Sequence, residues 1–342
     1  MRNNLYPKSI AILYSEAKRE YFPTEEQFIT EQEVYPRAKV VAKYIQKMGI
    51  KTYLFPGNEK LPQMLKKSQP EMAINLVDSV RGDESLQSTI PSLLELMEIP
   101  YTGAGILGST LVCNKFLVKK ILEQNGIPVP RYQLISSPND PLDPALRYPL
   151  ISKLNEVHGA VEITYDAVSD NEKHLRKRLK YLINTYKQDI LIEEFIVGRE
   201  ITSILLEGVN KKVYSAEKIF EKTKQKYILA TFDANWGKGP SFHYKKYPNN
   251  EYLKELVKEA FEVLGHDDYS KFDIREDESG RFYFIDCNAN PALGPRETDC
   301  AIATILDLYG VDFEEILERL ILNTMRAAKG IEKIEPTPGN NH

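Results

Sequence analysis

Cysteine is scarce in this sequence, and its few copies are spaced too widely for the common cysteine motifs. The 342 residues include Cys113, Cys287 and Cys300, and no two of them form a Cys-x-x-Cys pair. An odd, dispersed set argues against a disulfide framework and against a zinc site, and it favours a reducing compartment. We therefore expect a cytoplasmic protein.

Long apolar runs and an excess of positive charge are also missing. Runs such as "SIAILY" at 9–14 are far shorter than the roughly 20 residues of a membrane-spanning helix. The first 20 residues lack the apolar core and cleavage site of a signal peptide, so we expect no cleaved leader. The formal net charge of −4 gives no support for nucleic acid or an anionic membrane as a partner.

The composition that remains is that of a globular protein. It is 42% hydrophobic and 27% charged, and 342 residues suffice for two or three domains. In the first hundred residues, strand-like segments alternate with amphipathic helical segments. The strand-like segments are 9–15, 51–56 and 72–77, and the helical segments are 33–49, 61–69 and 86–99. This alternation predicts a parallel sheet with crossover helices.

Later segments indicate strands that are joined by turns. Residues 136–149 are rich in Pro, Asp and Ser and predict a surface excursion, and residues 189–208 read as strand, turn, strand. Residues 269–290 form two strand-like runs around the acidic turn "EDESG", which is a hairpin signal. The basic run at 171–187 is interpreted as a solvated helix face more readily than as a partner-binding patch.

The second strand of this hairpin ends on polar side chains. In "FIDCNAN", strand alternation puts Asp286, Asn288 and Asn290 on one face, with Cys287 and Ala289 on the other. Such a row could bind a hard cation, or it could start a solvated loop.

The hairpin pattern favours the cation. It brings Asp273 of the first strand opposite residues near Asp286, and a buried pair of carboxylates is unfavourable unless positive charge compensates it. We therefore predict a Mg²⁺ site at Asp273, Asp286 and Asn288, of the kind that shares its ion with phosphate oxygens.

Four stretches of the sequence resemble the D-alanine–D-alanine ligases of the ATP-grasp superfamily. They are "LMEIPYTGAGILGSTLVCNK" followed by "GIPVPRY", then "YPLISKL", then "ILIEEFIVGREITSILL", and finally "GHDDYSKFDIREDESGRFYFIDCNANPALG". Their order and spacing are specific for the fold and for ATP-dependent ligation. The resemblance covers most of the chain.

The resemblance implies an α/β fold of the ATP-grasp type. A Rossmann-like domain would span residues 1–112, a central subdomain 113–192 and a C-terminal subdomain with the metal site 193–342. It also implies that a substrate carboxylate attacks the γ-phosphate of ATP and that an amine then displaces phosphate from the acyl phosphate. The expected cofactors are ATP and one or two Mg²⁺ ions, for which Mn²⁺ could substitute.

The resemblance also assigns nucleotide-binding residues. Lys115 and Lys153 match the family's phosphate-binding lysines, although a lysine is most often a surface residue. Lys153 lies inside the apolar strand "PLISKL", where a lysine needs a partner. Glu193, Glu194 and Ile196 match the segment that holds adenine through its backbone, and Glu200 matches the carboxylate that binds ribose.

The segments that the resemblance assigns to substrate binding depart from the family pattern. The GGxSxE signature is absent, but Glu31 in "FITEQEV" stands where a glutamate holds the first substrate's ammonium; alternatively it is only an acid favoured by a helix terminus. Lys271 replaces an arginine near the acyl phosphate, without its bidentate geometry. His158 in the short phosphate loop is interpreted either as a structural residue or as a phosphate contact. Lys238 is the candidate for a lysine that is otherwise missing.

The last substrate loop, "NPALGPRETD", differs most. Ala292 replaces a glycine, and Glu297 stands near the position of a serine that binds the second D-alanine's carboxylate. An acid there would repel that carboxylate at a cost on the order of several kcal/mol, whereas Arg296 could bind one. We therefore hypothesise a ligase for small carboxylate and amine substrates that are not two D-alanines.

Other readings stay open. They are a genuine D-alanine–D-alanine ligase, a nucleotide-binding protein that has lost ligation, and an ATP-grasp phosphotransferase or non-peptide ligase. Family members often form dimers, so a homodimer is also an expectation.

Overall fold

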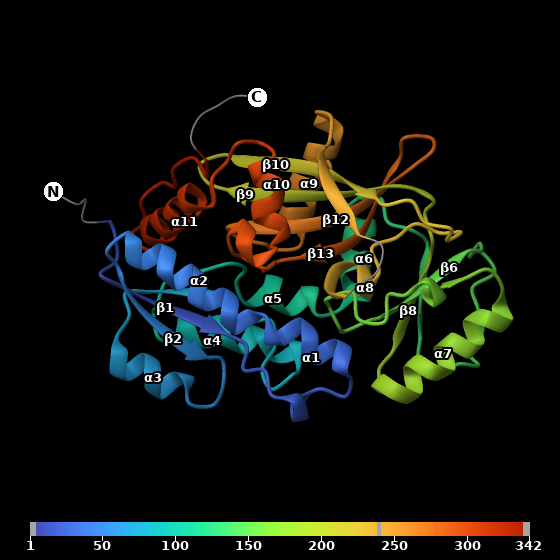
Figure 1. The fold of residues 1–342 in the computed structure, drawn as a ribbon, viewed down its shortest axis with the longest axis horizontal. Coiled ribbons are helices and arrows are strands. Elements are labelled where there is room, and N and C mark those ends of the chain that lie inside the picture. The colour runs from blue at the N-terminus through green and yellow to red at the C-terminus, as the bar shows by residue number, and fades with distance from the viewer. Residues whose placement is uncertain (1–4, 238–240, 338–342) are drawn as a thin grey trace.

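A four-stranded parallel sheet forms the N-terminal part of the computed structural model, which describes residues 5–237 and 241–337 (Figure 1). Its order is β2-β1-β3-β4, and neighbouring strands pair in parallel. The strands are β1 (Ser9–Tyr14), β2 (Lys51–Pro56), β3 (Met72–Leu76) and β4 (Tyr101–Thr102). The alternating pattern predicted this arrangement, which is confirmed.

Helices cover both faces of this sheet, because each of them carries one apolar stripe. In α2 (Val34–Lys47) the buried residues Val34, Ala38, Val41 and Ile45 are three or four positions apart, which places them on one side. The helices α3 (Leu61–Ser68) and α4 (Thr89–Leu96) bury leucines in a second cluster with Ala11 and the opposite face of β1. The remaining helices here are α1 (Glu25–Gln32) and α5 (Ile106–Val112).

The central part is an antiparallel sheet with one long helix. Its order is β5-β8-β6-β7, from β5 (Tyr132–Ile135), β6 (Leu150–Leu154), β7 (Val168–Ser169) and β8 (Ile190–Glu194). Helix α7 (Glu172–Tyr186) buries Leu175, Leu179 and Leu182 on the sheet and exposes most of its basic residues, and the solvated-face interpretation of this run stays a prediction.

The C-terminal part is a five-stranded antiparallel sheet of order β11-β10-β9-β12-β13. Its strands are β9 (Gly198–Glu207), β10 (Lys211–Phe220), β11 (Phe242–Lys246), β12 (Tyr269–Asp277) and β13 (Phe282–Asn288). Two helices cover one face, α9 (Glu251–Val263) and α6 (Lys115–Gln124), although α6 precedes the central sheet in the chain. The predicted boundaries at residues 112 and 192 stay predictions.

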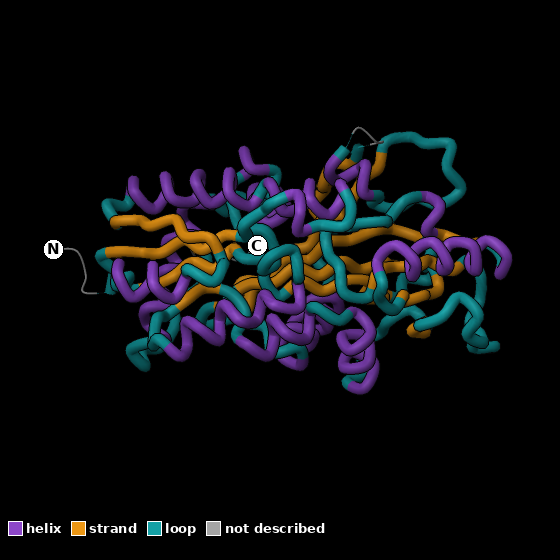
Figure 2. Tube along the Cα trace, turned by 90° about the horizontal axis from the view of Figure 1, so that it is seen from below, coloured by secondary structure: helices purple, strands orange, loops and turns teal. Residues whose placement is uncertain are grey.

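The N-terminal and C-terminal sheets share one hydrophobic core. Residues of β1 and α2 pack in the same cluster as Ile204 of β9, Tyr269 of β12, and the helices α10 (Ala301–Asp307) and α11 (Phe313–Ala327). The central sheet has its own cluster, to which Phe232 of the short helix α8 (Phe232–Trp236) also belongs. Figure 2 shows the strands running through the molecule between layers of helices.

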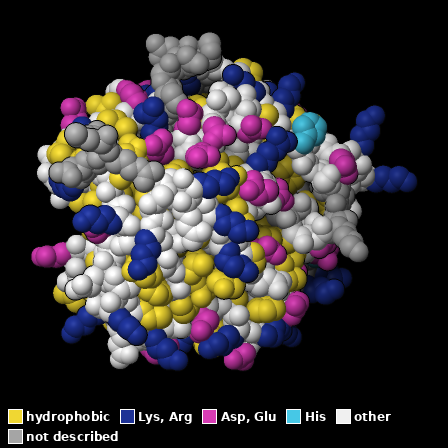
Figure 3. Space-filling model, turned by 60° about the vertical axis from the view of Figure 1, so that its left-hand side comes forward, with side chains coloured by type: hydrophobic (Ala, Val, Ile, Leu, Met, Phe, Trp, Pro, Cys, Tyr) yellow, Lys and Arg dark blue, Asp and Glu magenta, His cyan; other side chains and the backbone are white. Residues whose placement is uncertain are grey.

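Two surface features bear on partners. Among the described residues, no helix combines the length and the apolar character that a membrane crossing requires. On the face drawn in Figure 3, Lys and Arg side chains are interspersed with Asp and Glu side chains instead of gathering in one patch.

Gly108 of α5 fixes the distance between the N-terminal part and the loop before β12. A Cβ atom at Gly108 would lie 2.4 Å from the carbonyl oxygen of Gly265, which is backbone and cannot rotate away. In an open helix, alanine would be about 1 kcal/mol more favourable than glycine. Overpacking against backbone costs about 1–3 kcal/mol, so the contact outweighs the helix preference.

We therefore expect Gly108→Ala to lower the free energy of unfolding by about 1 to 2 kcal/mol, as measured by urea denaturation. Thr110→Ala is the matched control, because Thr110 is an exposed residue of the same helix; it should change stability by less than about 0.5 kcal/mol. A Gly108→Ala protein that is more stable than the native one would contradict this packing.

Candidate active site

A cavity of about 780 Å³ is lined by residues of all three sheet regions. Its volume lies within the roughly 300 to 1,000 Å³ that small-molecule sites occupy. Many of the lining residues are charged. The N-terminal part contributes Glu31, Arg37, Asp78 and Glu84; α6 and the central part contribute Lys115, Lys153, His158 and Glu193; the C-terminal part contributes Glu200, Lys218, Lys271, Asp273, Arg275, Asp286 and Asn288.

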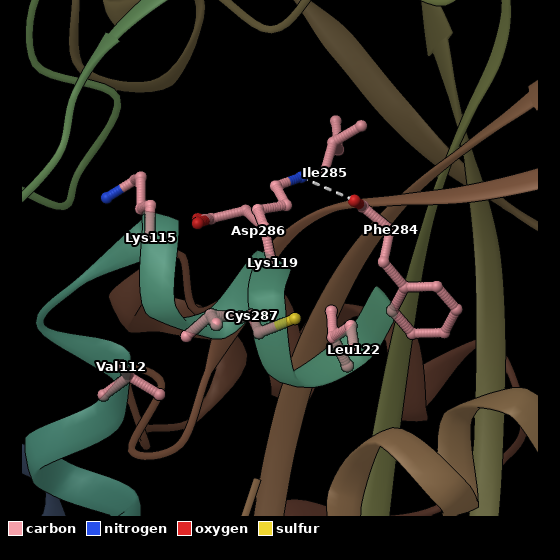
Figure 4. Close-up of a pocket in the computed structure, with 9 residues that line it drawn as sticks. Val112, Lys115, Lys119, Leu122, Phe284, Ile285, Asp286 and Cys287 are labelled. Carbon is pink, nitrogen blue, oxygen red and sulfur yellow. Dashed lines mark hydrogen bonds between the residues drawn. The ribbon is translucent and has the colours of Figure 1, made fainter. Parts of the chain in front are cut away.

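Two lysines share the buried carboxylate of Glu193. The antiparallel register pairs Lys153 of β6 with Leu191 of β8, so Lys153 and Glu193 are diagonal neighbours on one face. Lys153 Nζ lies 2.8 Å from Glu193 Oε2, and Lys119 Nζ lies 3.1 Å from Oε1. Lys119 also donates to the carbonyl oxygen of Phe284 at 2.7 Å (Figure 4). Two cations against one anion leave a surplus positive charge, which Lys153 presents to the cavity.

Lys115 begins helix α6 and supplies a second positive charge. Its Nζ donates to the carbonyl oxygen of Val157 at 2.7 Å, and Figure 4 shows Lys115 and Asp286 extending toward the same side. Burial alone would raise the pKa of the Asp286 carboxyl, but nearby positive charge, above all that of Lys115, lowers it overall. Asp286 is therefore ionised at neutral pH and faces a lysine.

The hairpin β12–β13 has the predicted register and alternation. Asp273 pairs directly with Asp286, and a β-bulge follows between Asp273 and Ile274. Asp286 and Asn288 line the cavity, whereas Cys287 is buried in the core beneath the sheet. The predicted alternation is confirmed for Asp286, Cys287 and Asn288, but it does not extend to Ala289 and Asn290, which both line the cavity because β13 ends at Asn288.

Positive charge compensates Asp273 in this structure. Lys218 Nζ lies 3.3 Å from Asp273 Oδ1, Thr202 donates to the same oxygen at 2.7 Å, and Lys271 pairs with Oδ2. Burial would raise the pKa of Asp273, but Lys218 and then Lys271 lower it far below its usual range.

The same lysine joins Glu200 to this network. Glu200 is held by Lys218 at 2.8 Å and by Arg275 at 2.7 Å, so each of its oxygens has a cationic partner. Burial would lower the pKa of Lys218, but Asp273 and Glu200 raise it overall. Lys218 is therefore charged, and its ammonium lies between the expected ribose-binding residue and the expected metal ligand.

The donor set suits a hard cation that also takes ligands from a substrate. No group of three or more His, Cys, Asp or Glu side chains in residues 5–237 and 241–337 could enclose a metal ion by itself. Two carboxylates that oppose each other in register, with the amide oxygen of Asn288 beside them, fit Mg²⁺ that completes its shell with water and phosphate oxygens. The metal assignment stays a prediction, since Asp273 already has cationic partners.

Three carboxylates of the N-terminal part also line the cavity. Glu31 near the end of α1, Asp78 after β3 and Glu84 in the turn before α4 all line it. Burial, and then the neighbouring Asp78, raises the pKa of the Glu31 carboxyl. Burial also raises the pKa of Glu84 to about 8.

His158 contacts one of these acids. Its backbone N–H donates to both carboxylate oxygens of Glu84 at 2.9 and 3.0 Å, and its Nε2 lies 3.5 Å from Oε2. Burial, and then Lys115, lowers the pKa of His158 to about 3, so the ring is uncharged at neutral pH. In this arrangement His158 joins the central loop to the N-terminal part, which agrees with its structural interpretation.

The remaining predicted residues divide into two groups. Glu194, Ile196, Ala292 and Glu297 line the cavity. The Glu194 N–H donates to the carbonyl oxygen of Arg131, and the Ile196 carbonyl accepts from Arg275. Glu297 is exposed at the cavity's edge and accepts the Tyr44 hydroxyl at 3.1 Å.

Two predicted residues are not brought to the cavity. Arg296 is 72% exposed, pairs with Asp307 at 2.7 Å and does not line the cavity, because the short turn at Arg296–Thr298 separates its side chain from that of Glu297. Lys238 lies outside the described residues.

Sequence reasoning missed several charged residues of the site. They are Lys119, Lys218, Arg275, Arg37, Asp78 and Glu84. The signal for Lys218 was weaker than that for Lys153, because Glu217 precedes Lys218 in the strand segment "SAEKIF". The acids of the N-terminal part gave no such signal, because a loop after a parallel strand is commonly polar.

Comparison with known proteins decides the family. Residues 121–322 match the family model described as "D-ala D-ala ligase C-terminus", which is more than half of the chain. The chain belongs to this family. It is accordingly a ligase of the ATP-grasp type, as the four stretches predicted.

Similar proteins and structures agree with this family. A D-alanine–D-alanine ligase of Geobacter sulfurreducens is 27% identical over 296 residues, which cover 85% of this chain and 89% of that protein. The uncharacterized protein y4sG of Sinorhizobium fredii is 25% identical over 275 residues, with 76% and 80% covered. The crystal structure of the Bacillus anthracis D-alanine–D-alanine ligase complexed with ATP has a TM-score of 0.70 at 19% identity, over 94% of this chain and 99% of that one, and it confirms the fold.

Glu193 gives a testable consequence of the geometry. Because its removal leaves buried lysines without a carboxylate, Glu193→Gln should lower the free energy of unfolding by about 3 kcal/mol near pH 7. The pKa of Glu193 is lowered in the folded protein, so its stabilising effect is present above the ordinary value of 4.5 and is lost as the pH falls below it. The difference in the free energy of unfolding between the native protein and Glu193→Gln should therefore become smaller at acidic pH, as measured by urea denaturation between pH 3 and 7.

Glu194→Gln is the control for this experiment. Glu194 is the next residue of β8, is only partly buried and accepts one backbone N–H, that of Arg147, at 2.8 Å. Its substitution should cost less than about 1 kcal/mol. Equal losses in the two variants would show that the lysine pair does not depend on Glu193.

Proposed function

We propose that this protein is an ATP- and Mg²⁺-dependent ligase that forms an amide or peptide bond through an acyl phosphate, with substrates other than two D-alanines. The observation that carries the proposal is the cluster of Lys115, Lys153 and Lys271 beside Asp286 in one cavity. Phosphoryl transfer needs positive charge held in place more than it needs covalent catalysis.

Each lysine has a role that follows from its place. Lys153 presents the surplus charge of the Lys119–Glu193–Lys153 group, and Lys115, the first residue of α6, presents its ammonium beside Asp286. These two hold the phosphates of ATP. Lys271, next to the hairpin carboxylates, neutralises charge that develops on the acyl phosphate.

Mg²⁺ would be held by Asp273, Asp286 and Asn288 and would neutralise phosphate charge there, and Mn²⁺ could substitute for it. Glu193, Glu194 and Ile196 border the region proposed for adenine. Glu200 reaches the ribose only if it shares its oxygens between the sugar and the Lys218–Arg275 pair.

Glu31 is proposed to hold the ammonium group of the first substrate. Its carboxylate lines the cavity at the side away from the lysines, so the substrate's carboxylate can point toward Lys271 while its ammonium points toward Glu31. This orientation puts the nucleophilic carboxylate next to the phosphate that it attacks.

Glu297 argues against a D-alanine as the second substrate. An amino acid whose carboxylate approached this edge would meet an acid, and Arg296 is engaged with Asp307 instead of facing the cavity. Genuine D-alanine–D-alanine ligation is the second candidate, and the similarity to proteins named D-alanine–D-alanine ligase favours it. Small-molecule substrates, a cytoplasmic location and a homodimer also remain proposals.

Substrate-dependent ADP release tests the proposal. We expect release with Mg-ATP in the presence of a carboxylate and an amine, from pools in which D- and L-amino acids are kept separate, and product mass would identify the bond formed. Release with D-alanine alone would establish the second candidate. A phosphorylated product without a new amide would instead indicate a phosphotransferase.

The hairpin carboxylate gives the site-directed test. Asp286→Asn keeps the shape but removes the charge opposite Asp273, so we expect kcat to fall at least 100-fold, on the scale of about 3 kcal/mol. Glu278→Gln, an exposed residue in the turn of the same hairpin, should leave kcat unchanged. Full activity of Asp286→Asn in a folded protein would remove this residue from the mechanism.

A further inference from the structure

The acids at the N-terminal side of the cavity are poorly compensated. Glu31 is only 6% exposed, yet its Oε2 has no hydrogen-bond partner. Within the described residues, the Asp78 carboxylate accepts no hydrogen bond although it lines the same space. A buried carboxylate oxygen without a donor is unfavourable, and in a cavity wall it marks a place where a donor can bind.

The cations near these acids are too few to neutralise them. Arg37 faces Glu31 and Asp78 and lowers the pKa of both, but burial outweighs it and keeps each pKa raised. Lys115 is the next cation, and it acts on Glu84, yet its ammonium is bonded to the Val157 carbonyl and also serves Asp286.

The other neighbours of these acids do not supply charge. His158 contributes backbone N–H bonds to Glu84, but its ring is uncharged at neutral pH. The hydroxyls of Ser15 and Ser79 act on Glu31 and carry no charge. Lys153 and Lys271 therefore attract anions, Glu31 and Asp78 attract cations, and Glu84 lies between these groups, near Lys115 and His158.

A single ammonium group would need only one of these acids. Glu31 already provides a carboxylate for it, and Arg37 offsets part of the second charge. Asp78 and Glu84 remain, at a side of the cavity that is formed by segments after β3 and before α4. The ligand that fits is an organic cation with more than one positive group.

We propose that one substrate of this enzyme is an amino acid with a cationic side chain, a diamino acid, whose α-ammonium binds at Glu31 and whose second cation binds at Asp78 and Glu84. This inference rests on the proposed ligase function and names the substrate class of the same cavity. The substrate's carboxylate then lies toward Lys271 and its two positive groups lie among the acids, which matches the division of charge in the cavity.

The experiment compares lysine with norleucine, which has the same chain length and lacks the side-chain ammonium. ADP release is measured with Mg-ATP for D- and L-lysine, D- and L-ornithine, and D- and L-norleucine, each with the pooled amines. We expect kcat/KM for a diamino acid to exceed that for norleucine of the same chirality at least tenfold. An equal or higher value for norleucine would overturn the inference and leave the ligase proposal standing.

Asp78→Asn tests the assignment of the residue. In this variant the ratio of kcat/KM for lysine to kcat/KM for norleucine should fall toward one. Glu59 is an exposed acid of the same sheet region, so Glu59→Gln should keep the native ratio. A preference for lysine that survives in Asp78→Asn and in Glu84→Gln would overturn the assignment. The native protein's lysine-to-norleucine ratio tests the substrate class even if a variant fails to fold.

A binding measurement separates this inference from the ligase proposal. Because the free acids have raised pKa values, a bound cation should lower them and release protons, and affinity for lysine should rise between about pH 5 and 8. Calorimetry in buffers of different ionisation enthalpy detects that release. Lysine binding with proton release but no ADP formation would support the cation site and overturn the ligase. If lysine neither binds nor releases protons, the cation site is overturned.

Discussion

The buried carboxylate of Glu193 is the interaction on which the cavity depends most. It binds Lys153 of the central sheet and Lys119 of α6, and both lysines also donate to backbone carbonyls of β13, at Ile285 and Phe284. One acid thereby connects two sheets across the cavity floor. Without it, the two ammonium groups would repel each other in a low-dielectric interior, where such repulsion is weakly screened.

The charges of the cavity follow from this arrangement. The lysines gather where α6, β6 and the β12–β13 hairpin converge, and the acids gather on segments that follow strands of the parallel sheet. A substrate that bridges the two sides is oriented by its own charges, with its anionic end at the lysines. Under the proposed function, residues on the acidic side can change while the lysines are kept, so a family member could alter its substrates without altering its lysine cluster.

The sequence predicted the parts of the site that have a local pattern. Alternation placed Asp286 and Asn288 on one face, the hairpin turn brought Asp273 opposite Asp286, and a lysine within a mostly apolar strand identified Lys153. The residues that it missed are fixed by contacts between distant segments. Lys218 meets Glu200 and Asp273 only through the order of β10, β9 and β12, and Asp78 lies near Glu31 although 46 residues separate them in the chain. Arg296 shows that residues adjacent in the sequence can also be separated by the fold, since its side chain and that of Glu297 point to different places from one tight turn.

The division of the hydrophobic core has a consequence for motion. The N-terminal and C-terminal sheets share one core and cannot separate without exposing it, whereas the central sheet has a core of its own and joins the rest through the segments 125–131 and 195–197. The central sheet is nevertheless held by more than these two crossings, because Phe232 of α8 packs in its core and Lys153 donates to the Ile285 carbonyl of β13. The loop before β7 adds polar contacts: the Trp236 indole donates to the Gly159 carbonyl, and the backbone N–H groups of His158 and Glu162 donate to Glu84 and Glu26. A rotation of the central sheet about the crossings would therefore have to break apolar as well as polar contacts.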